Sequence, residues 1–492
     1  IFLFFSYSYL GINNYIDPIE PTISSISSAL LNGQSIYPDS QSINKYSIPY
    51  GPMTYLVHVF IFYLFGSTIF TSKVVGFVFG IINIILFFNI SFIITKSKHI
   101  SIIVLGFIMN YSMFFPQLFV WNRPDSILVA SISLGIIGIL SNSRLVRTVL
   151  PGVMMGLALN LKVHSILLFI PIFIMLYKSH NISQSLKSFL IGILIFILPF
   201  LIDNISFINY LNILINTSKH GFSLSLFIDI IQYQLILFLP LIFSFFSQNK
   251  TIYDIINNIK NLSNRSNVLI FMLFLLYQLI GSKPGAGVHH LFAVSPFMLV
   301  IYSKSIFLWK PTKSNVNKIL PIIFLSTFLT SFYFSGTRTI QHIITTAKFD
   351  GKEIIDDLKS IDSSYPKKRI TMGFGSDSKN RAIWFRSYLQ YLGHPLIIDP
   401  RAMMDMQYDK NKIDKINNLF SDYYFIEDGE IGDIVLIPKN EKPFMMKNNY
   451  YYPKNIPLLK NKFREIFNYH FYKVGSSIFF DIYIKSENNL EF

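Results

Sequence analysis

The sequence contains no cysteine and few charged residues, which make up 14% of its 492 positions. The lack of cysteine excludes disulfides and thiolate metal sites, and it leaves no indication of the redox compartment. Soluble proteins carry roughly 25% charged residues. The low charge and the mean hydropathy of +0.45 therefore argue against an ordinary soluble chain. No metal-binding motif is visible, so we expect no metal and no other cofactor.

Acidic residues are scarce in residues 1–336, which hold 7 Asp and Glu against 19 Lys and Arg. Residues 337–492 hold the other 20 acidic and 23 basic residues, as a soluble domain does. The basic excess of the apolar region indicates short basic loops at a membrane surface and argues against a nucleic-acid-binding face. We therefore predict a transmembrane domain over residues 1–336 and a soluble domain over residues 337–492.

Long apolar runs predict an α-helical protein with about eleven membrane spans, since a crossing takes roughly 17–25 apolar residues. The first run is short for a span, so we expect either a helix cut at its N-terminal side or a removed signal segment. The predicted spans lie near residues 1–12, 73–95, 100–116, 126–142, 148–162, 164–177, 188–205, 227–247, 267–281, 290–303 and 318–336.

Residues 52–66 are also apolar, and their placement decides the topology. If they form a helix in the membrane interface, 13 basic residues and only one acid, Asp254, share one side. Because positive loops stay cytoplasmic, we predict a multi-pass protein of the inner or plasma membrane, with its N-terminus inside and its C-terminal domain extracytoplasmic. The outer side then holds Asp17, Glu20, Asp39, Asp125, Asp203 and Asp229.

The first outer cluster follows the first predicted span directly. Asp17 and Glu20 are flanked by prolines, which stiffen the backbone that carries them. Residues 22–31 have the apolar spacing of a short amphipathic helix, which Gly33 ends. The two acids are candidates for a functional site. Solvated loop acids, or caps of the following helix, are the alternative.

Two further clusters combine a cation with a polar partner at the outer ends of spans. Arg123 and Asp125 open one span, where the helix dipole favours the carboxylate and the arginine could simply snorkel. Lys162 and His164 lie in a hairpin with almost no loop. A lysine so close to hydrocarbon costs a few kcal/mol unless it has a partner. Either an anionic ligand or a lipid phosphate could supply one.

The fourth cluster is the glycine-rich segment 281–290, which contains Lys283, His289 and His290. Glycines let backbone amides approach a phosphate, and lysine adds a point charge. Adjacent histidines on one helix point about 100° apart, so we expect hydrogen bonding to a phosphate or sugar rather than a shared metal. Four such clusters on one side are a stronger signal than any one of them.

At these residues the sequence resembles the GT-C glycosyltransferases, especially bacterial relatives of the protein mannosyltransferases and of the aminoarabinose lipid A transferase. An acidic pair after the first span matches Asp17 and Glu20, and a later tyrosine-proline phrase matches Tyr50-Gly51-Pro52. The Arg-Pro-Asp motif is 123–125, the hairpin lysine is Lys162, and the late glycine-rich phrase is 281–290. The resemblance covers roughly residues 1–336. It departs from the family at His289-His290, where relatives have Asn-Tyr, and at Val163, where they often have Gln.

The resemblance implies a sugar donor on a polyprenyl monophosphate, an inverting attack by an acceptor hydroxyl and no cofactor. It implies Asp17 as the general base, with Glu20 as the substitute, and Arg123, Lys162, Lys283 and His289 at the donor phosphate. Asp125, Tyr50, His164 and His290 would then contact substrate. The acceptor could be a lipid, a glycan or a protein. A lipid or sugar transporter is the main alternative, although no internal repeat is visible, and a non-catalytic assembly partner is a third.

The C-terminal domain alternates strand-like and helix-like runs, so we predict a small α/β domain. Segment 373–377 could bind an anion between a strand and a helix, although a plain turn is the simpler interpretation. Tyr450–Tyr452 could dock on the membrane interface or on sugar. The predicted strands are 369–374, 395–399, 423–428 and 433–439, and the predicted helix is 378–392.

Overall fold

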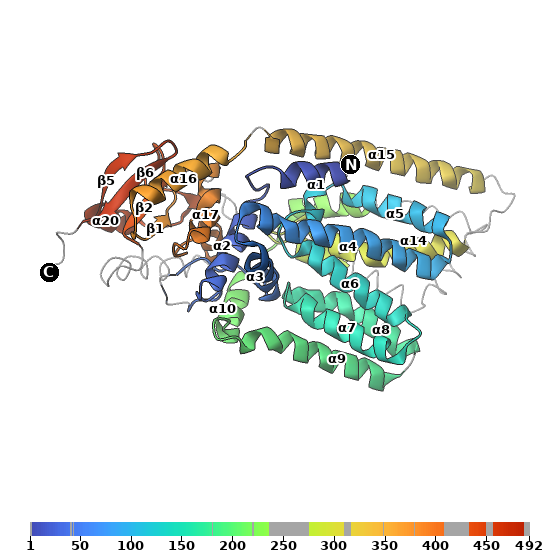
Figure 1. The fold of residues 1–492 in the computed structure, drawn as a ribbon. Helices are drawn as coiled ribbons and strands as arrows, with labels where there is room; N and C mark the ends of the chain where they lie inside the picture. The colour runs from blue at the N-terminus through green and yellow to red at the C-terminus, as the bar shows by residue number, and fades with distance from the viewer. Residues whose placement is uncertain are drawn as a thin grey trace. The chain divides into compact units, whose positions relative to one another are not determined.

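The computed structural model describes residues 2–39, 42, 44–179, 181–218, 221–235, 275–308, 316–347, 349–377, 379–407, 432–448 and 456–486. The chain divides into two compact units (Figure 1). The first, here called the helical unit, comprises Ile1–Tyr9, Gly76–Pro199 and Phe222–Thr345. The second, the mixed unit, comprises Leu10–Val75, Phe200–Gly221 and Thr346–Phe492. The sequence analysis divides the chain differently, into a transmembrane domain that ends at residue 336 and a soluble domain that begins at residue 337. That division concerns which residues lie in a bilayer, and it stays a prediction.

The helical unit consists of apolar helices joined by short turns. In the part that the structure describes, its α-helices are α1 (Phe2–Leu10), α4 (Ile69–Thr95, which begins in the mixed unit), α5 (Lys98–Ser112), α6 (Asp125–Leu140), α7 (Arg144–Leu159), α8 (Ile166–Ser179), α9 (Ile182–Ile197), Leu224–Leu235, α14 (Ser295–Leu308) and α15 (Val316–Ala347). Short 3₁₀ segments are η1 (Pro116–Phe119), η2 (Val163–Ser165), η3 (Leu198–Leu201) and η4 (Val288–Val294). Helix α7 packs against both α6 and α9 (Figure 1).

Each predicted span overlaps a helix in the part of the chain that the structure describes, so the mostly helical character of the prediction is confirmed. By length and composition, two described helices could cross a bilayer, at Ile69–Thr95 and Ile182–Leu201. Shorter apolar helices lie at Met53–Phe65, Asp125–Leu140, Val163–Lys178 and Leu224–Leu235. Apolar helices satisfy their own backbone hydrogen bonds, as lipid requires. The number of spans and their sidedness stay predictions.

A close helix-to-loop contact fixes the segment that leads into α6. A Cβ atom at Gly76 of α4 would lie 2.1 Å from the carbonyl oxygen of Trp121, so only glycine lets the two backbones approach this closely. Phe119, Val120 and Trp121 are buried there. The loop that carries Arg123 is therefore held against α4.

The mixed unit joins two N-terminal helices to the C-terminal residues. Its helices are α2 (Ile19–Leu31), α3 (Met53–Phe65), α10 (Phe207–Thr217), α16 (Lys352–Ser364), α17 (Arg386–Tyr391, preceded by the 3₁₀ segment η5, Arg381–Phe385), α18 (Pro400–Met406) and α20 (Asn461–His470). Helix α2 packs against α3 and against α17. The predicted helix at 22–31 is confirmed, and Gly33 follows it with φ = 86°. The helix predicted at 52–66 is also confirmed, and its interfacial position stays a prediction.

A four-stranded mixed sheet forms the centre of the C-terminal residues, in the order β1-β2-β6-β5. Its strands are β1 (Ile370–Met372), β2 (Ile434–Pro438), β5 (Phe471–Ser476) and β6 (Phe480–Lys485), and a separate pair is formed by β3 (Lys447–Asn448) and β4 (Ile456–Pro457). Only β1 and β2 are parallel.

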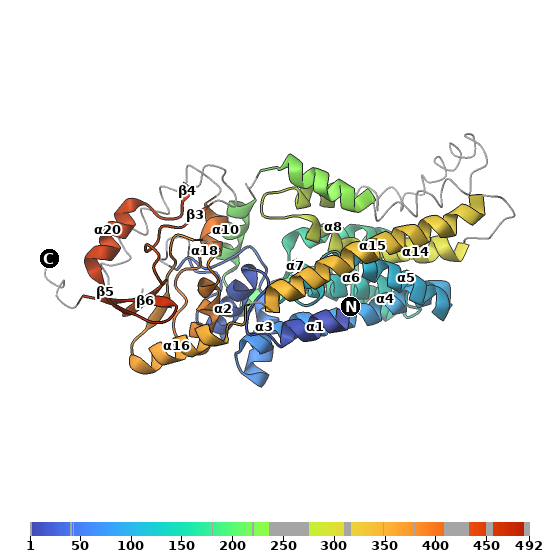
Figure 2. The same ribbon diagram turned by 90° about the horizontal axis from the view of Figure 1, so that it is seen from above.

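The two faces of this sheet bury different helices, as Figure 2 shows from above. Val435 and Ile437 of β2 pack with the buried face of α20, whereas Ile434 and Leu436 pack with that of α16. This alternation follows from the two-residue period of a strand. The strand is buried on both faces and is therefore apolar at every position.

Two details of the C-terminal prediction are wrong, and two lie outside the described residues. Segment 395–399 joins no sheet; its only strand-like contact is an isolated parallel bridge from Ile398 to Lys45. The helix predicted over 378–392 begins as 3₁₀ at Arg381. The strand at 423–428 and the tyrosines at 450–452 fall outside the described ranges. Loop 373–377 binds a carboxylate of the protein itself, since the amides of Ser376 and Asp377 donate to Glu441 Oε2 at 2.7 and 2.9 Å.

Candidate active site

The acidic loop between α1 and α2 is organised by its own glutamate. Glu20 lies in the first turn of α2 and is fully buried. Its Oε2 accepts hydrogen bonds from the backbone amides of Ile16 at 2.9 Å and of Asp17 at 3.0 Å. A carboxylate that accepts amide hydrogen bonds is held in one place and stabilised in its charged form. Glu20 therefore fixes the backbone of Asp17.

Asp17 has a different environment although it is only three residues away. Its side chain is partly exposed, and its Oδ1 accepts a hydrogen bond from the amide of Ile19 at 2.9 Å, which starts α2. Of the two acids, Asp17 is the one with an accessible side chain.

Lys73 is a site residue that the sequence analysis missed. It is fully buried near the start of α4, donates from Nζ to the carbonyl of Ile12 at 2.6 Å and interacts electrostatically with Glu20. A lysine inside an apolar run was the available signal. Tyr50 is partly buried, and its carbonyl accepts a hydrogen bond from the Tyr37 hydroxyl at 2.6 Å.

In the helical unit, the Arg-Pro-Asp motif and the hairpin lysine lie close together. Pro124 caps α6 and Asp125 is the first helical residue, where the helix dipole favours an anion. Lys162 Nζ lies 2.6 Å from Asp125 Oδ1, and Arg123 Nε lies 3.6 Å from Asp125 Oδ2. All three side chains are at most 6% exposed. Two cations therefore converge on one buried carboxylate.

Aromatic rings surround the same cations. The Arg123 guanidinium lies 4.2 Å from the centroid of the Trp121 ring, and its Nη2 donates to His289 Nε2 at 3.1 Å. Arginine has only donors, so this histidine nitrogen carries no proton. Desolvation and the neighbouring Arg123 both hold the pKa of His289 well below its ordinary value. His289 is therefore a neutral acceptor that helps to orient Arg123.

The other two histidines complete a cluster around these charges. The ring of His290 lies 4.6 Å from that of His289 and 5.4 Å from that of His164, between centroids. Lys283 acts electrostatically on His164. We call Arg123, Asp125, Lys162, His164, Lys283, His289 and His290 the cationic cluster. It contains one arginine, two lysines and one carboxylate.

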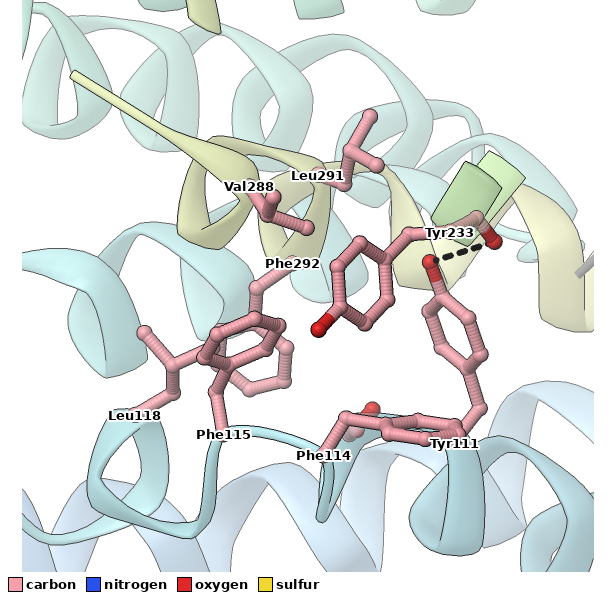
Figure 3. A pocket seen from close by; sticks show the side chains of 9 residues that line it. Tyr111, Phe114, Phe115, Leu118, Tyr233, Val288, Leu291 and Phe292 are labelled. Atoms are coloured by element: carbon pink, nitrogen blue, oxygen red, sulfur yellow. Dashed lines mark hydrogen bonds between the residues drawn. The ribbon is translucent and has the colours of Figure 1, made fainter. Parts of the chain in front are cut away.

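A pocket lined mainly by aromatic side chains adjoins this cluster (Figure 3). It is a small, partly open space with a volume of about 10 Å³. The rings of Tyr111 and Tyr233 stand opposite Phe292, and the Tyr111 hydroxyl donates to the Tyr233 carbonyl at 3.3 Å. Its wall includes η4, which also carries the two adjacent histidines of the cationic cluster. The lining residues are Tyr111, Ser112, Phe114, Phe115, Leu118, Tyr233, Val288, Leu291 and Phe292.

The structure thus brings together every predicted site residue of the helical unit. In the mixed unit it joins Asp17 and Glu20 through the Asp17 amide, while the described contact of Tyr50 is with Tyr37. Among the described residues, no group of three His, Asp or Glu side chains could hold a metal ion. Metal-independent chemistry stays a prediction.

The described architecture is similar to that of solved structures, and the resemblance inferred from the sequence is confirmed for the fold alone. The structure is similar to that of ArnT from Cupriavidus metallidurans bound to undecaprenyl phosphate, with a TM-score of 0.59. That match has 10% identity and covers 99% of this chain and 97% of ArnT. The apo form of the same protein matches with a TM-score of 0.58 over 98% of this chain and 96% of that one.

The archaeal oligosaccharyltransferase AglB from Archaeoglobus fulgidus aligns more weakly, with a TM-score of 0.43 and 11% identity over 87% of this chain and 66% of that one. No protein-family model matches the sequence, and no curated protein matches it either. Likeness at 10% identity establishes only the fold, so the function has to follow from the residues of the candidate site.

Proposed function

We propose that this protein is a glycosyltransferase that moves a sugar from a polyprenyl-phosphate donor to an acceptor hydroxyl at the outer membrane face, with inversion. The observation that carries the proposal is the cationic cluster, in a chain whose fold matches ArnT over nearly its whole length. ArnT binds undecaprenyl phosphate in one of those structures. The protein would then be a multi-pass membrane enzyme whose C-terminal domain is extracytoplasmic.

The charge of the cationic cluster suits a phosphate that becomes more negative during the reaction. A sugar linked to polyprenyl phosphate is a phosphodiester with one negative charge. When the bond between the anomeric carbon and the phosphate oxygen breaks, its electron pair stays on the oxygen, and polyprenyl phosphate gains a second charge. Arg123, Lys162 and Lys283 would stabilise that charge, and preorganised groups of this kind are each worth about 10²–10³ in rate.

The remaining members of the cluster would orient the donor. Neutral His289 holds the Arg123 guanidinium, and His164 and His290 offer hydrogen bonds to phosphate or sugar oxygens. The aromatic side chains beside η4 would pack against the first apolar units of the polyprenyl chain, because the surface that they form is almost entirely apolar. A lipid phosphate has both features, a charged head and an adjoining hydrocarbon chain.

Asp17 is the better candidate for the base, because Glu20 is buried and engaged with two backbone amides. The acceptor oxygen would form its bond to the anomeric carbon while its proton passes to the Asp17 carboxylate. Glu20 would act as a positioning residue for Asp17. Asp125 would hold Lys162 in place, and Tyr50 would contact substrate. The acceptor would be a lipid, a glycan or a protein hydroxyl.

The direct test is transfer of radiolabelled sugar from a panel of polyprenyl-phosphate donors by the purified full-length protein in lipid nanodiscs. Lys283→Met should lower kcat/KM about 10²-fold, because it removes phosphate stabilisation without breaking a described ion pair. Lys187→Met is the matched control, since Lys187 is exposed on α9. Absence of transfer from every donor, together with movement of intact donor across proteoliposome membranes, would establish a transporter instead.

A further inference from the structure

The acidic loop is contacted by three separate segments of the C-terminal residues within the mixed unit. The amide of Asn13 donates to Asp350 Oδ1 at 3.2 Å, and the side-chain amide of Asn14 donates to the carbonyl of Phe349 at 3.4 Å. A Cβ atom at Gly351 would lie 2.4 Å from the carbonyl oxygen of Asn13. The second and third segments are α17 and the start of α18.

Arg386, the first residue of α17, reaches the backbone directly beside Asp17. It is 2% exposed. Its Nη2 donates to the Pro18 carbonyl at 3.3 Å and to the Thr22 hydroxyl at 2.6 Å, and its Nη1 donates to the carbonyl of Ile383 at 2.8 Å. The planar guanidinium thus ties the first turn of α2 to the C-terminal domain with fixed geometry.

Asp399 completes this connection from the third segment. It is fully buried, and its Oδ2 accepts from Arg386 Nε and from the Thr22 hydroxyl, the latter at 2.9 Å. Its Oδ1 accepts from the amides of Arg401 and Ala402 at 2.8 and 3.0 Å and so caps α18. A buried carboxylate with this many donors is fixed in position and in turn fixes Arg386.

A second group of hydrogen bonds joins the same elements through hydroxyl groups. Tyr391, at the end of α17, bonds through its hydroxyl to the Tyr15 hydroxyl at 3.0 Å and to the hydroxyl of Ser24 on α2. The Tyr15 hydroxyl also lies 3.1 Å from Ser72 Oγ on α4. The acidic loop is therefore held at Tyr15 on one side of Asp17 and at Pro18 and Thr22 on the other.

We propose that the C-terminal domain positions the catalytic acidic loop, with Arg386 as the main positioning residue and Asp399, Thr22 and Tyr391 as its supports. This role rests on the proposed function of Asp17. Displacing a catalytic group by about 1 Å can cost 10²-fold in rate. A loop that is closed by Pro18 and tied at both ends to the C-terminal residues loses that freedom of displacement.

The first measurement follows the loop and needs no enzyme activity. Amide hydrogen exchange of residues 13–24 is compared in nanodiscs between the wild-type protein, Arg386→Lys and Tyr391→Phe. Arg386→Lys keeps the positive charge but loses the planar guanidinium with its several N–H donors. Amide hydrogen exchange of residues 13–24 should therefore rise about tenfold, while that of β2 and β6 stays unchanged. Unchanged exchange of the loop in both variants would overturn the proposal, whatever the protein catalyses.

The second measurement asks whether positioning contributes to catalysis. Thr22→Val should lower kcat about 10-fold to 10²-fold with little change in donor KM, and Thr22→Ser, which keeps the hydroxyl, should restore kcat. Asp481→Asn is the matched control, because it removes a buried carboxylate of the same domain that pairs with Lys473 at 2.8 Å and does not contact the loop. A loss in the control equal to that in Thr22→Val would mean general destabilisation and would overturn the positioning role.

The two measurements separate this proposal from the proposed function. If loop exchange responds to Arg386→Lys but the wild-type protein transfers no sugar from any donor, the transferase function is wrong and the connection between loop and domain stands. If transfer occurs but neither exchange nor kcat responds, the transferase function stands and the positioning role is wrong.

Discussion

The two units hold the charges of the candidate site in different ways. In the helical unit the charges are satisfied by one another, since Arg123 and Lys162 both lie against Asp125. In the mixed unit the acidic loop is held by hydrogen bonds to the backbone, with Glu20 accepting two amides and Arg386 reaching the Pro18 carbonyl. The first arrangement depends on side-chain charge alone, whereas the second adds backbone hydrogen bonds to its charge pairs, since Lys73 interacts with Glu20 and Arg386 pairs with Asp399.

This difference shows what each unit can tolerate. Removing one member of a buried ion pair leaves an uncompensated charge, which is strongly destabilising. Replacing a carboxylate that accepts amides by its isosteric amide keeps an acceptor in place and costs less.

Asp17→Asn should lower the transfer rate about 10³-fold or more, because it removes the base but keeps an oxygen that can accept from the Ile19 amide. Protein yield and the melting temperature should stay close to the wild-type values. The measurement is single-turnover sugar transfer in nanodiscs. Asp203→Asn, at an exposed acid of the same unit, serves as the control and should be fully active. Full activity of Asp17→Asn would remove Asp17 from the mechanism.

Lys162→Met should cost about 3–5 kcal/mol of stability, because it leaves Asp125 buried without its closest cation. The double variant Lys162→Met with Asp125→Leu should recover much of that stability but not the transfer activity, which should stay about 10²-fold below wild type. Thermal unfolding and donor transfer are measured on the same preparations. Recovery of activity in the double variant would show that the pair is purely structural.

Glu20→Gln should lower transfer only about tenfold, because the amide oxygen still accepts from the amides of Ile16 and Asp17. Glu20→Ala, which removes the acceptor, should cost roughly ten times more. The ratio of the two kcat values is the measurement. If Glu20→Gln were as inactive as Asp17→Asn, Glu20 would be the base and the assignment of the two acids would be reversed.

Lys45→Met should stabilise the protein without changing transfer. Burial lowers the pKa of Lys45 from 10.5 to about 8, and the charge of Asp39 only partly opposes this. The folded state therefore disfavours the ammonium, a penalty that is complete below pH 8 and vanishes as the pH rises toward 10.5. At pH 7 the variant should melt about 2–4 °C higher, and this difference should shrink between pH 8 and 10.5. A difference that is independent of pH would exclude a titration of Lys45.

Much of the fold follows from apolar periodicity and run length. The helices of the helical unit lie where continuous apolar runs predict them, because a helix in lipid needs no partner to satisfy its backbone. The C-terminal domain was harder to predict. Strands β5 and β6 and helix α20 were not recognised, since short segments with mixed polarity carry a weak local signal. Segment 395–399 has the apolar composition of a strand, but it lies against Lys45 outside the sheet.

Several candidate-site residues could be singled out from the sequence, but Lys73 was missed, and the roles of the others stay predictions. Arg123, Asp125 and Lys162 stand out because a charge beside hydrocarbon is expensive. Their pairing required coordinates, and so did the separation of roles between Asp17 and Glu20. Arg386 carried no signal at all, because an arginine in a soluble domain is ordinary until its contacts are known.

The sequence by itself determined the class of the molecule, which is an apolar helical chain with charges confined to a few turns. Hydropathy and charge are properties of single residues, so they can be read directly from the sequence. Only the tertiary structure decided which of these charges meet and which carboxylate is left accessible. Such contacts join residues as far apart as Pro18 and Arg386. Since they depend on loop closure and packing between distant segments, no local pattern encodes them.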